Sequence, residues 1–365
     1  QQYQQPYMSA GTAALTPYMA AAQNVSQPYT MAQYQASPYY QAGQSAARQA
    51  SDALKAQGWN IVWLVTEGGM ENRLIEGKGY QKAIITMEGV RGKGLLGWVL
   101  LPVKLAKALS QSYRAIHQHQ PNVVLGMGGF AAFPGGLMAK LLGKPLVIHE
   151  QNSVAGLTNK IMAKLANRVL AAFPNALNNA QVVGNPVRES ITKLAQPAAR
   201  FNKHTAALRV LVVGGSLGAQ ALNELIPQAI AAMPKKARPE VIHQAGVKHI
   251  EALKANYVKH GVEADCRAFI ENMDEMYSWA DFVICRAGAM TVAELSAVGL
   301  GSLLVPFPFA VDDHQTTNAV YLAEHEAAYL VQQKALTVEK LVEILSGLTR
   351  KNCLEIANRA RALGK

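Results

Sequence analysis

Short apolar runs alternate with amphipathic stretches along most of this chain, and this alternation constrains the fold more than any other feature. The first series has strand-like runs at residues 60–65, 82–87, 122–129 and 145–152. A second series begins at residue 208 with "LRVLVVGGSLGAQALNEL" and ends with "SLLVPFP". Strands separated by helices in this way usually form parallel sheets. The pattern therefore predicts an α/β protein.

The two series indicate two domains. A chain of 365 residues is too long for one ordinary hydrophobic core. We expect an N-terminal domain over residues 48–185 and a C-terminal domain over residues 186–345, with the linker region near residues 184–205. Each domain is expected to be an open Rossmann-like sheet with helices, and the two are expected to face each other across a cleft.

Residues 1–47 differ from the rest of the chain. They contain no charged residue and consist mainly of Gln, Ala, Tyr, Pro and Ser. With few aliphatic anchors and no strand-like run, such a tract is typical of a disordered leader. It also lacks the basic start and apolar centre of a secretory signal.

Composition and charge exclude several classes of protein. No apolar run approaches the roughly 18 to 20 residues of a membrane-spanning helix, and three scattered cysteines form neither a disulfide framework nor a zinc motif, which favours the cytoplasm. The net charge of +11 is concentrated in the first half, where residues 48–185 carry 15 Lys and Arg against 6 Asp and Glu. Such a basic half attracts an anionic membrane or a phosphorylated substrate. No nucleic-acid motif is present, so nucleic acid is not expected as a partner.

The stretch "VLVVGGSLGAQALNEL" reads as a strand, a glycine turn and a helix. Gly214 and Gly215 permit a tight turn, Ser216 offers a hydroxyl, and the helix after Gly218 begins with N–H groups that no residue of its own helix can bond. This arrangement suits an anionic ligand, although a plain glycine corner between strand and helix explains it too. A dinucleotide fold would need G-x-G-x-x-G at this turn, but Ser216 stands at the second glycine and Ala219 at the third, so a NAD-dependent oxidoreductase is disfavoured.

The stretch "CRAGAMTVAE" has the same architecture. Gly288 precedes a helix whose first N–H groups, at residues 289–291, are suited to a diphosphate. Glu294, one turn later, would repel phosphate but would accept hydrogen bonds from a ribose diol. A favourable first helical turn explains a glutamate there equally well. Two such elements in one domain, at the strand ends where ligands bind, together favour a nucleotide.

Five motifs occur together in the order "GMGGF", "HEQNSVAGLTNK", "VVGNPVR", "VVGGSLGAQALN" and "ICRAGAMTVAE". They resemble the MurG family of peptidoglycan N-acetylglucosaminyltransferases over roughly residues 53–363. The resemblance implies a GT-B fold and inverting transfer of N-acetylglucosamine from UDP-N-acetylglucosamine to the muramyl-pentapeptide diphosphoryl-undecaprenol lipid. It places the protein at the cytoplasmic face of the plasma membrane, as a peripheral enzyme of cell-wall biogenesis, without a cofactor or a bound metal. It also implies a C-terminal helix, residues 346–365, packing back toward the N-terminal domain.

The resemblance also assigns residues to the ligands. Those expected at the UDP-sugar are Asn152, Arg188, Ser216, Ile270, Ala289, Met290, Thr291, Val292, Ala293, Glu294 and Gln315. Among them Ser216 would lie by the nucleotide, the backbone of Ile270 would meet the uracil, and Glu294 would meet the ribose. The donor sugar would contact Asn152 and Gln315, and Arg188 would lie near the donor. The acceptor diphosphate is expected at Gly128 and Gly129.

The run at residues 90–109 combines apolar and basic side chains. Its composition suits a segment that rests on an anionic membrane surface, with the basic groups at the lipid headgroups, although a core helix with a basic edge has the same composition. The residues expected to contact the membrane are Arg91, Lys93, Leu95, Leu96 and Trp98.

The chain departs from the family pattern at its start. The family begins with a strand and a loop of the form G-G-T-G-G-H, whose histidine is a candidate general base. Here the first histidine is His117, and no strand-like run precedes Ile61. We therefore leave the catalytic base unassigned and expect an incomplete first sheet. A UDP-sugar-binding protein with little turnover, or a related GT-B glycosyltransferase acting on another lipid, remain alternatives.

Metal binding is not expected. His117 and His119 are two residues apart, so they point in different directions on a helix. The "DDH" run at residues 312–314 places adjacent side chains that rarely converge on one ion.

Overall fold

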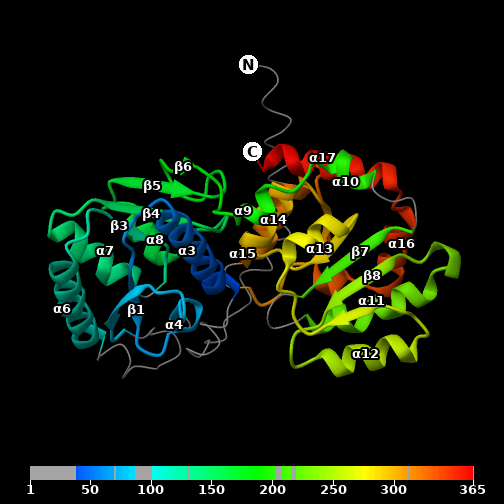
Figure 1. Cartoon of the computed structure of the whole chain (residues 1–365), viewed down its shortest axis with the longest axis horizontal. Helices are drawn as coiled ribbons and strands as arrows, with labels where there is room; N and C mark the ends of the chain where they lie inside the picture. Colours follow the sequence, from blue (N-terminus) through cyan, green and yellow to red (C-terminus); the bar gives the residue numbers. More distant parts are fainter. Residues whose placement is uncertain are drawn as a thin grey trace, which may run out of the picture.

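The computed structural model describes residues 38–69, 71–87, 101–129, 131–202, 207–214, 219–310 and 313–364. Figure 1 shows two lobes, an N-terminal domain that ends with β6 and a C-terminal domain that begins with β7. This is the expected α/β architecture with two Rossmann-like domains.

The N-terminal domain contains parallel strands in βα order. Its helices are α3 (Pro38–Ala56), α4 (Glu71–Leu74), α6 (Leu101–His119), α7 (Ala132–Leu141) and α8 (Leu157–Met162). Its strands are β1 (Val62–Thr66), β2 (Gln81–Ile85), β3 (Val124–Gly126), β4 (Leu146–Glu150), β5 (Arg168–Ala171) and β6 (Gln181–Val182). All pairings among these strands are parallel.

The strands described for the N-terminal domain form two separate sheets instead of one. β1 pairs with β2, and the other sheet has the order β3-β4-β5-β6. Each sheet has its own small core: Trp63 and Val65 pack with Ile75 beside β1, whereas Leu146 and Ile148 pack beside β4. Residues 1–37, where the first strand of the family would lie, are outside the described part of the chain, so the expectation of an incomplete first sheet stays a prediction.

The C-terminal domain has one six-stranded parallel sheet of order β12-β11-β10-β7-β8-β9. Its strands are β7 (Arg209–Val213), β8 (Glu240–Gln244), β9 (Asp265–Arg267), β10 (Phe282–Cys285), β11 (Gly301–Leu304) and β12 (Tyr329–Leu330). Its helices are α11 (Gln220–Ala232), α12 (Ile250–Lys259), α13 (Met273–Trp279), α14 (Ala289–Val298), α15 (His314–Ala323), α16 (Val338–Gly347) and α17 (Arg350–Leu363). Two short helices, α9 (Glu189–Thr192) and α10 (Pro197–Phe201), lie in the connection between the domains.

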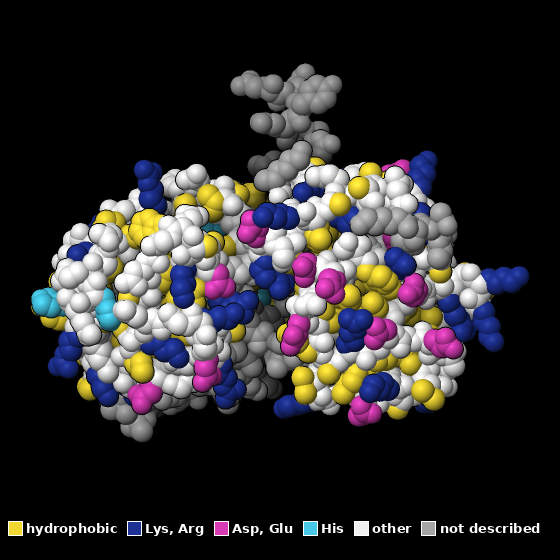
Figure 2. All heavy atoms as spheres, in the orientation of Figure 1, with side chains coloured by type: hydrophobic (Ala, Val, Ile, Leu, Met, Phe, Trp, Pro, Cys, Tyr) yellow, Lys and Arg dark blue, Asp and Glu magenta, His cyan; other side chains and the backbone are white. Residues whose placement is uncertain are grey.

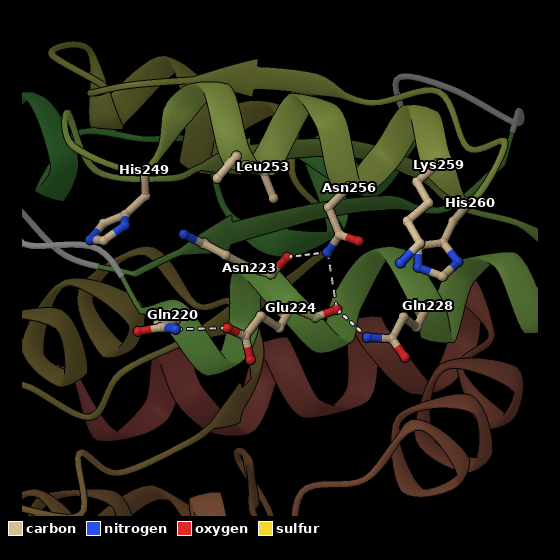
Figure 3. A pocket seen from close by; sticks show the side chains of 10 residues that line it. Gln220, Asn223, Glu224, Gln228, His249, Leu253, Asn256, Lys259 and His260 are labelled. Atoms are coloured by element: carbon tan, nitrogen blue, oxygen red, sulfur yellow. Dashed lines mark hydrogen bonds between the residues drawn. The ribbon is translucent and has the colours of Figure 1, made fainter.

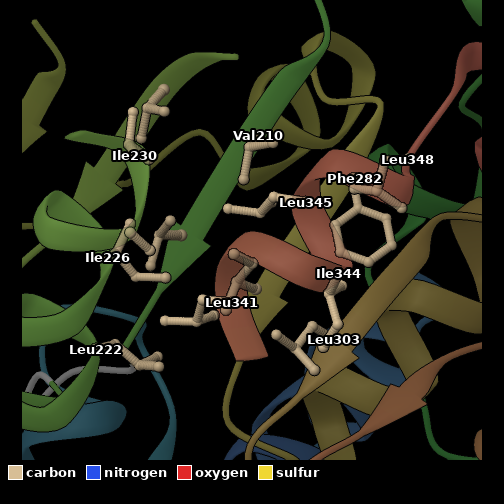
Figure 4. Close-up of a cluster of buried hydrophobic side chains, with 14 of the residues drawn as sticks. Val210, Leu222, Ile226, Ile230, Phe282, Leu303, Leu341, Ile344, Leu345 and Leu348 are labelled. Atoms are coloured by element: carbon tan, nitrogen blue, oxygen red, sulfur yellow. The ribbon is translucent and has the colours of Figure 1, made fainter. Parts of the chain in front are cut away.

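Both faces of this second sheet are covered by apolar side chains, which explains the continuous Val, Ile and Leu runs of β7 and β10. On one face, α11 and α16 pack on the sheet through Ile226 and Leu341 among others (Figure 4). On the other face, α14 and α13 contribute Val292, Leu295 and Tyr277. Truncating one such fully buried side chain to alanine costs about 2 to 5 kcal/mol, so this sheet is firmly anchored.

Of the two expectations about the chain ends, one needs correction and the other stays a prediction. The expected boundary at residue 47 falls inside α3, because small residues let this helix pack closely: Ala42 and Ala46 are buried, and Ala42 joins a core cluster of the C-terminal domain. Residues 1–37 lie outside the described part of the chain. The C-terminal helix α17 packs mainly on α14, α10 and β11. Its Ala360 shares a core cluster with Ala42 of α3, and the expected packing toward the N-terminal domain stays a prediction.

The charge and hydropathy of the described residues are relevant to the expected contact with a membrane. No helix among the described residues combines the length and apolar composition needed to cross a bilayer. On the face shown in Figure 2, Lys and Arg side chains are spread over both domains instead of forming one patch. The expected membrane-contact residues 91, 93, 95, 96 and 98 lie outside the described residues.

Candidate functional site

The two glycine turns of the C-terminal domain lie at the same edge of its sheet. β7 and β10 are adjacent parallel strands, and Val213 is paired with Cys285. The chain therefore leaves the sheet toward Gly214 and toward Gly288 from neighbouring strand ends. Ser216 and its neighbours 215–218 lie outside the described residues, so the position of the Ser216 side chain stays a prediction.

Helix α14 begins directly after Gly288, and no side chain caps its first turn. The backbone N–H groups of Ala289, Met290 and Thr291 therefore depend on a group from outside the helix. Together with the positive end of the helix dipole, they favour an anion at this point. Ile270 lies in the same core cluster as Ala289 and Val292, on the same face of the sheet, and its contact with the uracil stays a prediction.

Glu294 is buried on α14 and both of its carboxylate oxygens are engaged. The Tyr277 hydroxyl donates to Oε2 at 3.0 Å, and the Arg188 guanidinium lies 3.4 Å from Oε1. Burial raises the pKa of Glu294, while Arg188 and the Tyr277 hydrogen bond act in the opposite direction. Two expected donor residues, Arg188 and Glu294, are thus in direct contact.

The "HEQN" motif lies at the end of β4 and is almost wholly buried. The carboxylate of Glu150 accepts from the backbone N–H of Asn152 at 3.0 Å and from the Asn159 side chain at 2.9 Å. His149 Nε2 lies 2.9 Å from the carbonyl oxygen of Gly184, so this nitrogen carries the proton. Burial lowers the pKa of His149, which disfavours the protonated ring. The motif is therefore a rigid, hydrogen-bonded corner.

This corner is joined to the C-terminal domain through Asn318 of α15. The Asn318 oxygen accepts from the Ser153 backbone N–H at 2.9 Å and from the Ser153 hydroxyl at 2.8 Å. Its amide nitrogen donates to Asn152 Oδ1 at 3.4 Å and to the Ala287 carbonyl at 3.3 Å. The Ser153 hydroxyl also lies 2.6 Å from that of Thr317. Asn318 thus links Asn152 to the loop that precedes α14.

The connecting segment "GNPVR" contacts both domains. Gly184 bonds to His149 in the N-terminal domain, and Arg188 bonds to Glu294 in the C-terminal domain. Between them, Asn185 donates to the carbonyl of Gln151 at 3.0 Å and to that of Ala289 at 3.4 Å. The linker therefore places the start of α14 against the end of β4.

The structure brings most of the expected donor residues to this junction. Asn152 meets α15 through Asn318, and Gln315 lies one turn before Asn318 on the same helix. The Gln315 side chain is buried and its oxygen accepts from the Phe307 backbone N–H at 2.9 Å. The donor sugar is therefore expected between α15 and the "HEQN" corner.

The expected acceptor residues lie at the end of β3. Gly128 and Gly129 have positive φ angles of 79° and 82°, a conformation that favours glycine. A Cβ on Gly128 would lie 3.5 Å from the Asn159 side chain of the "HEQN" corner. The glycine turn and the corner thus belong to one surface of the N-terminal domain.

A pocket of about 460 Å³ lies elsewhere, between α11 and α12 (Figure 3). None of the expected donor residues lines it. Its polar side chains bond mainly to the two helices themselves: Gln220 donates to Glu224 at 2.8 Å, and Asn256 donates to the carbonyls of Asn223 and Glu224. This groove is therefore explained by helix packing. No group of three or more potential metal ligands occurs among the described residues.

Several residues of the junction escaped the sequence analysis, namely Tyr277, Asn185, Ser153, Thr317 and Asn318. Sequence spacing could have predicted one of these residues. Asn318 follows Gln315 by three residues and therefore lies on the same face of the helix as this expected donor residue. Ser153 directly follows the "HEQN" motif. Nothing in the sequence pattern pointed to Tyr277.

Comparison with known proteins identifies the family. The model of the glycosyltransferase family 28 N-terminal domain matches residues 47–171, and that of the C-terminal domain matches residues 209–365. A protein of Nitrosospira multiformis, named UDP-N-acetylglucosamine--N-acetylmuramyl-(pentapeptide) pyrophosphoryl-undecaprenol N-acetylglucosamine transferase, is 53% identical over 86% of this chain and 89% of its own length. A protein of the same name from an Azoarcus species is 55% identical over 86% of this chain and 88% of its own. The chain belongs to the MurG family.

Solved structures agree with this membership. Acinetobacter baumannii MurG aligns with a TM-score of 0.78 at 38% identity, covering 87% of this chain and 91% of that one. The spinosyn rhamnosyltransferase SpnG aligns with a TM-score of 0.53 at 18% identity, which shows the shared two-domain fold alone. As a MurG-family chain, the protein is a glycosyltransferase with a GT-B fold, and the alternative of a binding protein without turnover is not favoured.

Proposed function

We propose that this chain transfers N-acetylglucosamine from UDP-N-acetylglucosamine to the lipid-linked muramyl-pentapeptide precursor of peptidoglycan. The observation that carries the proposal is the junction at which Asn318 and Asn185 hold the "HEQN" corner of one domain against the start of α14 in the other. Relatives with this named activity share more than half of their aligned residues with the chain.

The donor would lie at the C-terminal side of the junction. Its diphosphate is assigned to the first turn of α14, at residues 289–291, where N–H groups and the helix dipole stabilise negative charge. The ribose is assigned to Glu294, with Arg188 beside it, and the sugar to Gln315 and Asn152. This arrangement also stabilises the charge that develops on UDP as it leaves, so the reaction requires no cofactor.

The acceptor would approach from the N-terminal domain. Its diphosphate is assigned to Gly128 and Gly129, and its lipid to the membrane beside residues 91–98, which places the protein at the cytoplasmic face of the plasma membrane. In an inverting step, an acceptor hydroxyl attacks the anomeric carbon, the bond to UDP breaks, and the hydroxyl proton goes to a base. His149 is a poor base, because its Nε2 proton is committed to Gly184 and its Nδ1 lies 3.2 Å from the Gln151 amide.

A transfer assay with radiolabelled UDP-N-acetylglucosamine and a lipid-linked acceptor tests this function. We expect label in the lipid product, and loss of it in Asn152→Ala, with UDP affinity measured by calorimetry left unchanged. Tight UDP-N-acetylglucosamine binding without any transfer to this acceptor would refute the proposed reaction. Tight NAD binding without UDP binding would refute the whole assignment.

A further inference from the structure

Tyr277 occupies an unusual position for a core aromatic residue. It lies on α13, is 1% exposed and packs in the core cluster that contains Val292 and Leu295. Its hydroxyl nevertheless lies 3.0 Å from Oε2 of Glu294, on the neighbouring helix α14. A buried hydroxyl needs a partner, and here that partner is the carboxylate assigned to the ribose.

The two oxygens of Glu294 are bonded by two different residues. Tyr277 bonds to Oε2 and Arg188 lies beside Oε1. An ionised carboxylate has about four acceptor positions, two on each oxygen. With one position on each oxygen taken by the protein, one on each is left, which is the pattern needed to accept two hydrogen bonds from a cis-diol.

We propose that Tyr277 is a positioning residue that orients Glu294 and thereby sets the preference of the donor site for ribonucleotides over deoxyribonucleotides. This inference rests on the proposed function, which places the ribose at Glu294. Arg188 alone would leave the carboxylate free to rotate about its last bond, because a single ligand fixes one oxygen only. The bond from Tyr277 fixes the second oxygen, so that the plane of the carboxylate, and with it the direction of both remaining acceptor positions, is set.

A second buried tyrosine of the same domain provides a matched control. Tyr257 on α12 is 2% exposed, and its hydroxyl lies 3.0 Å from His243 Nδ1. Replacing either tyrosine by phenylalanine removes one buried hydroxyl and keeps the ring. Of these two tyrosines, Tyr277 alone contacts Glu294, the residue assigned to the ribose. A general effect on folding would therefore appear in both variants, whereas a positioning effect would appear only in Tyr277→Phe.

The test compares UDP, 2′-deoxy-UDP and 3′-deoxy-UDP by calorimetry on the full chain. We expect Tyr277→Phe to weaken UDP binding about tenfold, since a hydrogen bond to a charged group is lost, while the affinities for the deoxy analogues change little. The preference for the ribose would then fall about tenfold. Tyr257→Phe is expected to leave that preference unchanged. An unchanged preference in folded Tyr277→Phe would overturn the inference.

Glu294→Gln separates this inference from the proposed function. If Glu294→Gln keeps the full ribose preference, Glu294 does not meet the ribose and the donor assignment itself is wrong. If Glu294→Gln abolishes the preference but Tyr277→Phe does not, the donor assignment stands and the role of Tyr277 is wrong. Should Tyr277→Phe fail to fold, 3-fluorotyrosine at position 277 keeps the shape and donates more strongly, so an unchanged preference with that residue would also contradict the inference.

Discussion

Replacing Asn318 by alanine should loosen the junction between the domains by a measurable amount. Asn318 is fully buried, accepts two short hydrogen bonds from Ser153 and donates two longer ones to Asn152 and Ala287. A neutral hydrogen bond contributes roughly 0.5 to 1.5 kcal/mol. Weighting the two longer bonds less, we expect Asn318→Ala to lower the free energy of unfolding by about 2 to 4 kcal/mol.

A double-mutant cycle with Ser153→Ala isolates the contribution of the Ser153 hydroxyl, which is one of the contacts of Asn318 that cross the domains. Ser153→Ala removes the hydroxyl that bonds to Asn318 at 2.8 Å and to Thr317 at 2.6 Å. Because the two mutated side chains touch, their effects should not add, and we expect a coupling energy of about 0.5 to 1.5 kcal/mol. The free energies come from urea unfolding of the four proteins followed by circular dichroism.

Asn256 supplies the control for this cycle. Its side chain also donates two hydrogen bonds to backbone carbonyls, those of Asn223 and Glu224, but within the C-terminal domain. Asn256→Ala should destabilise the protein and combine additively with Ser153→Ala. If the Asn318 and Ser153 pair is as additive as the Asn256 and Ser153 pair, the contact does not join the domains in solution and the reasoning is wrong.

Three further predictions concern pH, the acceptor turn and the membrane. Burial lowers the pKa of His243 to about 3, so as the pH falls from about 6.5 to 3 the unfolded chain binds a proton at this residue that the folded chain does not. The free energy of unfolding should therefore decrease by at most about 1.4 kcal/mol for each pH unit of acidification. Urea unfolding should show a shallower decrease for His243→Gln, and equal slopes would contradict this. Gly128→Ala, at a φ of 79°, should cost about 1 to 2 kcal/mol and raise the KM for the lipid acceptor, but not for the donor. Replacing Leu95 and Trp98 by serine should reduce sedimentation with anionic vesicles without changing UDP affinity, and undiminished sedimentation would place membrane contact elsewhere.

The sequence predicted the sheets best where strands are fully buried. β7 and β10 are covered on both faces and appear as unbroken apolar runs, so strands were expected at both places. β6 and β12 are two residues long and partly exposed, and they carry no such signal. The early start of α3 was missed because Ala42, Gly43 and Ala46 look like low complexity, whereas in the fold their small size permits close packing.

The candidate site was predicted only as far as local motifs extend. The start of α14 and the "HEQN" corner were recognised because each is continuous in the chain. The bonds between Tyr277 and Glu294 and between Ser153 and Asn318 span 17 and 165 residues. No periodicity or spacing rule connects positions so far apart, because their contact depends on how helices and domains pack.

The division of the N-terminal sheet has a consequence for how the protein responds to heat. Regions with small, separate cores open at a lower free energy than regions with one large core. Among the described residues, the pair β1–β2 has a core cluster of four buried residues, whereas the donor half is built around extensive clusters on both faces of its sheet. On warming, the acceptor half should therefore melt first, and glycosyl transfer would disappear while the protein still retained its nucleotide.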